Sequence, residues 1–189
     1  MTEQPRHNRR GCLFAGYALG KLSPLKGIRP MTGEMDDATR LAPDDPRVPM
    51  VLDLIQRSFA YMEGRIDPPS SVQRLTPAAI AKQCEVGEVW VIGTPPKACV
   101  FLSPKADCLY LGKLAVDTDM QRQGLARRLV KLATDRAHTL GLPTLELKTR
   151  IELTENHEAF ERLGFSVISQ GCHDGYDRPT NLIMRRPVP

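Results

Sequence analysis

The 189-residue sequence contains no apolar run approaching the roughly 20 residues that a helix needs to cross a bilayer. It also contains no Cys-x-x-Cys pair and no histidine-rich segment, the patterns that are typical of zinc sites. An odd, scattered set of cysteines indicates free thiols in a reducing compartment rather than disulfides. We therefore expect a cytoplasmic protein with no membrane segment and no metal. The five cysteines are Cys12, Cys84, Cys99, Cys108 and Cys172.

Two nucleotide-binding signatures are missing as well. The chain has neither Gly-Lys-Ser/Thr nor Gly-x-Gly-x-x-Gly, which disfavours a nucleoside-triphosphate or dinucleotide site. No internal repeat or low-complexity block is present. The length suits one domain, and a hydrophobic content of 41% is enough for a real core.

Positive charge gathers at the beginning of the chain. Residues 1–30 carry a net charge of +5, whereas the whole chain carries +4. The remaining residues 31–189 therefore carry a net charge of only −1. A neutral body gives no support to a nucleic-acid partner. We interpret residues 1–35 as a disordered or loosely ordered basic leader. Residues upstream of a true start at Met31 or Met35, or a targeting segment around Cys12–Leu19, are the alternatives.

The rest of the chain alternates between strand and helix patterns. Apolar residues at steps of three and four predict helices, Thr76 with Pro77 predicts a capped helix start, and Gly141 predicts a helix end. We expect acids of the turn 43–46 to cap the first helix and Thr154 to cap the last. Strands are expected at residues 38–42, 89–92, 98–102, 109–116, 144–149, 165–169 and 181–185, and helices at 51–62, 77–84, 125–140 and 154–164.

The most specific feature is a strand, a glycine turn and a long helix in succession. The apolar run 109–116 leads into Gln121-Arg122-Gln123-Gly124-Leu125-Ala126. The first amides of a helix have no internal partner, and the helix dipole adds partial positive charge there. Gly124 lets a ligand approach the backbone because it has no Cβ. The pattern predicts an anion site at residues 121–127.

This arrangement resembles the core motif of the GNAT superfamily, the acyl-CoA-dependent N-acyltransferases. Its signature of Arg or Gln, two residues, Gly, one residue, then Gly or Ala stands here as Gln121, Gly124 and Ala126. The strand ending at Asp117 and the exit Leu163-Gly164-Phe165 of the next helix extend the resemblance over residues 38–186. It implies one domain over residues 36–189, an α/β fold with a mixed, largely antiparallel twisted sheet of six to seven strands flanked by about four helices.

The resemblance implies acetyl-CoA as a co-substrate. The turn amides would hold its pyrophosphate, and exposed backbone groups of the 109–116 strand would bind its pantetheine arm as an added strand. An ordinary buried strand, solvated arginines at 122 and 127, and helix-start hydrogen bonding by Asn156 are the alternatives. The implied cofactor-binding residues are Leu114, Ala115, Val116, Gln121, Arg122, Gln123, Gly124, Leu125, Ala126, Arg127 and Asn156.

The catalytic residues are harder to predict. A subgroup that this chain resembles has a tyrosine that protonates the departing CoA thiolate, but Phe160 stands there, and a phenyl ring donates no proton. Tyr176 is the candidate acid, and His173 and Glu152 are candidate bases; each is otherwise an ordinary surface residue. Lys113 either faces the substrate or lays its stem along the sheet.

We therefore expect an N-acetyltransferase that brings acetyl-CoA and a primary amine together for direct attack. The amine would belong to a small molecule or a peptide, with no nucleic-acid or membrane partner. A CoA-binding regulatory module that has lost catalysis is the alternative, because Phe160 replaces the usual acid. The oligomeric state stays open, with a homodimer as an option because dimers are common in this family.

Overall fold

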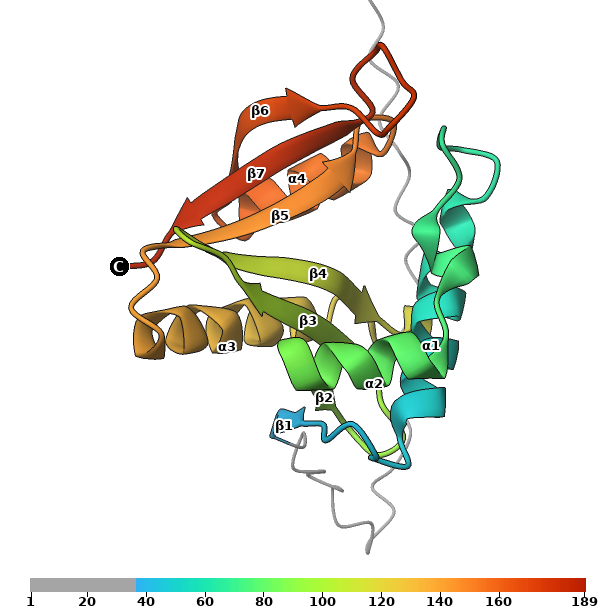
Figure 1. Ribbon diagram of the computed structural model, residues 1–189, viewed down its shortest axis with the longest axis vertical. Helices are drawn as coiled ribbons and strands as arrows, with labels where there is room; N and C mark the ends of the chain where they lie inside the picture. Colours follow the sequence, from blue (N-terminus) through green and yellow to red (C-terminus); the bar gives the residue numbers. More distant parts are fainter. Residues whose placement is uncertain (1–36) are drawn as a thin grey trace, which may run out of the picture. The chain divides into compact units, whose positions relative to one another are not determined.

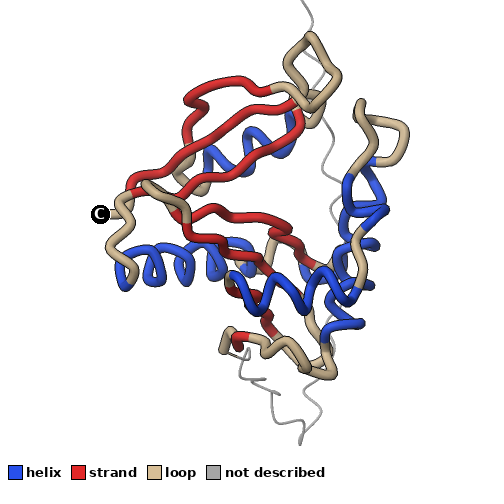
Figure 2. Tube along the Cα trace, viewed as in Figure 1, coloured by secondary structure: helices blue, strands red, loops and turns tan. Residues whose placement is uncertain are grey.

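The computed structural model describes residues 37–189, and the expected leader 1–35 lies outside them. Figures 1 and 2 show helices and strands mixed along the chain, with three strands in succession in the middle and two at the end. The described strands are β1 (Thr39–Arg40), β2 (Glu88–Ile92), β3 (Ala98–Pro104), β4 (Leu109–Val116), β5 (Thr144–Arg150), β6 (Ser166–Gly171) and β7 (Asn181–Pro187). The α-helices are α1 (Val48–Phe59), α2 (Pro77–Val86), α3 (Leu125–Thr139) and α4 (Thr154–Arg162), with short 3-10 turns η1 (Ala60–Met62), η2 (Ser71–Arg74) and η3 (Thr118–Met120).

The seven strands form one sheet in the order β1-β2-β3-β4-β5-β7-β6. Every neighbouring pair is antiparallel except β4 and β5, which are parallel and are connected through α3. A parallel pair needs such a crossover, whereas the Gly93–Pro96 turn joins the antiparallel β2 and β3 directly. The expected mixed, largely antiparallel sheet with four α-helices is confirmed within the described residues.

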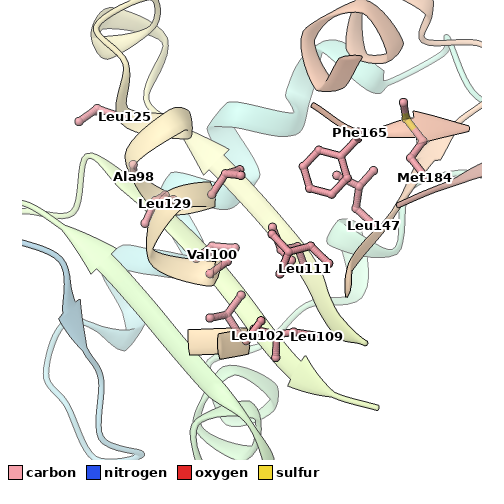
Figure 3. Close-up of a cluster of buried hydrophobic side chains, with 14 of the residues drawn as sticks. Ala98, Val100, Leu102, Leu109, Leu111, Leu125, Leu129, Leu147, Phe165 and Met184 are labelled. Atoms are coloured by element: carbon pink, nitrogen blue, oxygen red, sulfur yellow. The ribbon is translucent and has the colours of Figure 1, made fainter. Parts of the chain in front are cut away.

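Helices cover both faces of this sheet. On one face, the apolar side of α3 packs against β3, β4 and β5, and Figure 3 shows Leu129 of α3 between Ala98 and Val100 of β3. On the other face, α1 and α2 pack against the alternate residues of β2 and β3. This arrangement explains why β2 and β3 read as continuous apolar runs, since both sides of each strand are buried.

The helix ends agree in part with the sequence patterns. Thr76 caps α2 by accepting a hydrogen bond from the Ala79 amide at 3.2 Å, as predicted. Two expected caps are wrong: α1 has no side-chain cap because Asp45 accepts from the amide and guanidinium of Arg47 instead. Thr154 is the first residue of α4, since the carbonyl of buried Leu153 starts the helix. No helix of the described part has the length and apolar character to span a membrane.

Candidate functional site: an opening between two parallel strands

The strands β4 and β5 are paired for only part of their length. Their register joins Leu109 with Leu145 and Leu111 with Leu147, and no pairing follows beyond these residues. Figure 1 shows the two strands diverging from this paired end. The second half of β4 therefore presents an unpaired backbone edge toward β5, a place where an extended ligand can add hydrogen bonds.

A β-bulge in β4 accompanies this divergence. Cys99 of β3 lies opposite Ala115, but Phe101 lies opposite Gly112, so β4 holds one residue more than β3 over this stretch. Lys113 takes up the extra length with a φ of 48°, a left-handed conformation that is rare for a side-chain-bearing residue. A bulge bends its strand, and here it coincides with the point where β4 leaves β5.

The backbone of β4 alternates between its two neighbours beyond the bulge. The Asp117 amide donates to the Lys97 carbonyl at 2.8 Å, on the β3 side. By alternation, the amides and carbonyls of Leu114 and Val116 face the opening, whereas those of Ala115 face β3. The Val116 carbonyl already accepts a hydrogen bond from the Ser58 hydroxyl at 3.1 Å. Of the three residues expected to bind the pantetheine arm, Leu114 thus has the freest backbone.

A cavity of about 500 Å³ occupies the opening. Its floor comes from β4 and β5, one wall from the segment between α1 and η2, and the other from Asn156 and Phe160 of α4. This volume suits a small ligand or the end of a larger one. Two buried oxygens of its lining, Thr149 Oγ1 and Asn181 Oδ1, have no hydrogen-bond partner among the described residues. Such groups are ordinarily satisfied, so a ligand has polar positions to bind here.

The turn before α3 follows the C-terminal end of β4, after the short turn η3. Gly124 is the residue before the helix and has a φ of 81°, and Arg122 also has a positive φ of 62°. Within residues 37–189, the amides of Leu125, Ala126 and Arg127 have no hydrogen-bond partner, and the helix has no side-chain cap. No atom of the described residues lies within 4 Å of where a Cβ on Gly124 would stand. The structure therefore holds an open, positively polarised helix start where the sequence predicts an anion site.

Some side chains around this turn stabilise it, and others are exposed to solvent. Gln123 Nε2 donates to the Asp119 carbonyl at 3.3 Å, which braces the turn. Leu125 is buried in the α3 core, while Gln121, Arg122 and Arg127 are exposed. A second cavity of about 590 Å³ runs from Gly124 along α3 to Arg186, and cations dominate its lining.

Asn156 joins the two walls of the first cavity. Its side chain lies 2.9 Å and 3.1 Å from the Tyr61 hydroxyl of η1, with Asn156 Nδ2 and Oδ1 respectively. Burial raises the pKa of Tyr61, so its phenol stays protonated near neutral pH. Tyr61 was missed in the sequence because it ends an apolar helical pattern and nothing local links it to position 156.

Of the three expected catalytic side chains, His173 lines the cavity. Its Nδ1 lies 2.6 Å from Thr180 Oγ1, and its Nε2 lies 3.0 Å from Arg150 Nη1. Burial and the Arg150 charge lower the pKa of His173, so the neutral, proton-accepting ring prevails near pH 7.

Tyr176 and Glu152 do not line the cavity. The Tyr176 hydroxyl donates to Asp67 Oδ1 at 2.6 Å, and this carboxylate raises the pKa of Tyr176. Glu152 accepts from the Asp67 amide at 3.1 Å and lies 3.9 Å from Arg150. The two residues therefore meet at Asp67, where they hold the segment after η1 against β5 and the β6–β7 loop.

Phe160 faces the cavity and also packs into the core. Its ring meets Phe165 edge-on, with centroids 6.1 Å apart and an interplanar angle of 72°. Its phenyl ring therefore fills part of the cavity wall and has no proton to donate. Metal binding finds no support among residues 37–189, where no group of three or more His, Cys, Asp or Glu is gathered.

Comparison with known proteins identifies the family. A model described as the acetyltransferase (GNAT) family matches residues 56–165, more than half of the chain. Among curated proteins, no sequence gives a match. The chain is similar to the crystal structure of the ribosomal-protein-S18-alanine N-acetyltransferase from Escherichia coli, with 23% identity, a TM-score of 0.59, and coverage of 80% of this chain and 94% of that one.

Two further structures share the fold and were solved with ligands. The PaiA N-acetyltransferase from Thermoplasma acidophilum, in complex with coenzyme A, has 12% identity and a TM-score of 0.66, with 80% of this chain and 98% of that one covered. A GNAT family acetyltransferase from Elizabethkingia anophelis, with acetyl-CoA bound, has 16% identity and a TM-score of 0.57, with 80% and 97% covered. Identities this low establish the fold alone.

Proposed function

Because the chain belongs to the GNAT acetyltransferase family, we propose that it transfers an acetyl group from acetyl-CoA to a primary amine within a ternary complex. One observation carries this proposal: the unpaired edge of β4 leads from an open helix start at Gly124 to a cavity between β4 and β5. In a thioester of CoA, the pantetheine arm joins a diphosphate at one of its ends to a reactive carbonyl at the other, which matches these two features.

The backbone supplies most of the binding in this proposal. The amides of Leu125, Ala126 and Arg127 donate hydrogen bonds to the diphosphate, and the Leu114 backbone pairs with the amide-rich arm. The thioester carbonyl then lies in the cavity, where an amine attacks its carbon. The C–S bond breaks as the C–N bond forms, the CoA thiolate leaves, and the amine proton passes to neutral His173 directly or through water. Positioning contributes most of the rate enhancement.

A second candidate function is a CoA-binding regulatory module without catalysis. Phe160 favours it, because the cavity wall offers no proton for the leaving thiolate at this position. Steady-state release of free CoA in the presence of a broad amine panel separates the two. Binding without any turnover supports the module.

Calorimetry with acetyl-CoA tests the site, with desulfo-CoA and ATP as comparison ligands. We expect acetyl-CoA and desulfo-CoA to bind and ATP to bind weakly. Gly124→Ala should weaken acetyl-CoA binding by about tenfold or more, because a side chain at positive φ costs about 1–2 kcal/mol and shifts the turn. Failure of acetyl-CoA to bind the wild-type protein overturns the proposal.

Gly141→Ala provides the matched control. Gly141 has a φ of 67° and follows the opposite end of the same helix, and no atom of residues 37–189 lies within 4 Å of where its Cβ would stand. The two variants should lose similar melting temperature, but only Gly124→Ala should lose CoA affinity. Equal affinity in both variants means that the turn is not the anion site.

A further inference from the structure

The cavity lining between β4 and β5 has a strong charge bias. Four of its residues are arginine or lysine, and none is aspartate or glutamate: Arg74, Lys113, Lys148 and Arg150. A cavity with cations on several walls and no acid focuses positive potential on whatever enters it. A plain amine, which is itself a cation before it loses its proton, is poorly matched to this lining.

Lys113 carries the most informative of these charges. Its Nζ lies 3.0 Å from the Ser71 hydroxyl of η2, and no ion pair to it is present among the described residues. Burial lowers the pKa of Lys113, with no acidic neighbour to offset it. Lys113 is the bulge residue with a φ of 48°, and it lines the cavity. An uncompensated, partly desolvated ammonium is costly unless a ligand balances it.

The other cations reach the same cavity from different elements. Arg74 ends η2, which also supplies Ser71, the partner of Lys113. Lys148 and Arg150 alternate along β5 with Leu145 and Leu147, whose side chains pack in the core on the α3 side, so Lys148 and Arg150 face the α1 side.

Arg150 has another duty among these cations. It pairs with Glu152 at 3.9 Å and donates to the Pro68 carbonyl, so its charge is partly neutralised by an acidic partner. Lys113, Arg74 and Lys148 have no acidic partner within the described residues.

We infer that the acceptor is a small primary amine that also carries an anionic group, a carboxylate or a phosphate, held by Lys113 with Arg74 and Lys148. This inference rests on the proposed function and names its substrate class. The volume of about 500 Å³ accommodates a small acceptor beside the thioester end. Asn181 Oδ1 and Thr149 Oγ1 have no hydrogen-bond partner among the described residues, so they are available to accept hydrogen bonds from the N–H groups of the amine.

Matched pairs of acceptors test this class. CoA release is measured with alanine against alaninamide, and with O-phosphoethanolamine against ethanolamine, at saturating acetyl-CoA. Alaninamide has a lower amine pKa than alanine, so more of its amine is unprotonated and able to attack at pH 7. A preference for alanine would therefore run against the intrinsic reactivity of the two amines. We expect kcat/KM to favour an anionic member by about tenfold to a hundredfold. The pair that shows it identifies the carboxylate or the phosphate.

Variants at position 113 locate the contact. Lys113→Met keeps the unbranched stem and removes the charge, so the preference should fall about tenfold or more while acetyl-CoA affinity stays unchanged. Lys113→Arg should retain the preference, which separates anion binding from a role as a base. Lys82→Met, at an exposed lysine of α2 paired with Glu85 at 2.8 Å, is the control and should change neither quantity.

The outcomes separate this inference from the proposed function. If wild-type protein binds acetyl-CoA and acetylates the neutral members equally well or better, the inference fails and the proposed function stands. Acetylation of peptides alone, with no small anionic amine accepted, also overturns it. No binding of acetyl-CoA overturns the proposed function itself. The wild-type ratio is sufficient for this decision even if a variant does not fold.

Discussion

In the proposed reaction, the residue at position 160 bears on how the departing CoA thiolate obtains a proton. Phe160 faces the cavity and has nothing to donate. Two phenols of the described residues are engaged elsewhere, Tyr61 with Asn156 and Tyr176 with Asp67, whereas Tyr110 lines the cavity from β4 rather than from position 160. A thiolate whose conjugate acid has a pKa of about 8.5 leaves without full protonation, but it does so less easily at low pH than a group that receives a proton.

The substitution Phe160→Tyr should therefore speed the reaction. We expect kcat to rise about tenfold to a hundredfold at pH 7, because a positioned general acid contributes at least this much in other enzymes. The gain should shrink toward pH 9, where a free thiolate is a stable product. Stopped assays of CoA release across this pH range measure it, with melting temperature as the check on folding. An unchanged kcat at pH 7 would show that thiolate departure does not limit the rate.

At the scale of elements, Glu146 fastens the paired end of β4 and β5. It is 6% exposed and binds Lys105 of the β3–β4 loop at 2.6 Å and Arg185 of β7 at 2.9 Å. Burial alone would raise the pKa of Glu146, but the hydrogen bonds from the two cations outweigh it, and the pKa lies below its usual value.

Glu146→Gln should lower the free energy of unfolding by about 1–3 kcal/mol at pH 7, below the usual figure for a broken buried pair because both cations reach solvent. A lowered folded-state pKa gives stability that is present above the unfolded value near 4.5 and is lost as pH falls through the folded value. The difference between wild type and variant should thus be full at pH 7 and shrink below about pH 4.

Urea unfolding at pH 7 and pH 3.5 measures this difference. Asp53→Asn is the matched acid-to-amide control, since Asp53 pairs with Arg57 at 3.0 Å on the exposed surface of α1. It should change stability by less than about 0.5 kcal/mol at either pH. A pH-independent loss in Glu146→Gln would mean that packing, not charge, is what the substitution removes.

Local sequence patterns predicted the helices and strands far better than the contacts between residues that are far apart in the sequence. The strand, glycine turn and helix over residues 109–141 were readable because apolar spacing and glycine are local signals. The bulge could not be predicted from the sequence, because Lys113 lies within an ordinary strand pattern and its φ depends on the pairing of β4 with β3. Asp67 and Tyr176 lie 109 residues apart, so their hydrogen bond, which draws Tyr176 from the cavity, had no sequence signal.

At the scale of the whole molecule, the distribution of thiols argues for direct transfer. Among the described cysteines, Cys84, Cys99 and Cys108 are buried, and burial raises the pKa of Cys99 to about 12 and of Cys108 to about 11. Cys172 is exposed but does not line the cavity. A thiolate is the form of cysteine that attacks a thioester, so these residues offer no acyl-carrying group at the cavity.

Initial-rate kinetics should consequently show both substrates bound at once. Double-reciprocal plots against acetyl-CoA at several amine concentrations should intersect, as a ternary complex requires, and Cys172→Ser should keep full activity. Incubation with acetyl-CoA alone should leave no hydroxylamine-labile acetyl group on the protein by intact mass. Parallel lines, or an acetylated cysteine that an amine discharges, would mean that the acetyl group rests on the enzyme first. Direct transfer also requires the amine to meet the thioester inside the one opening that the diverging strands create.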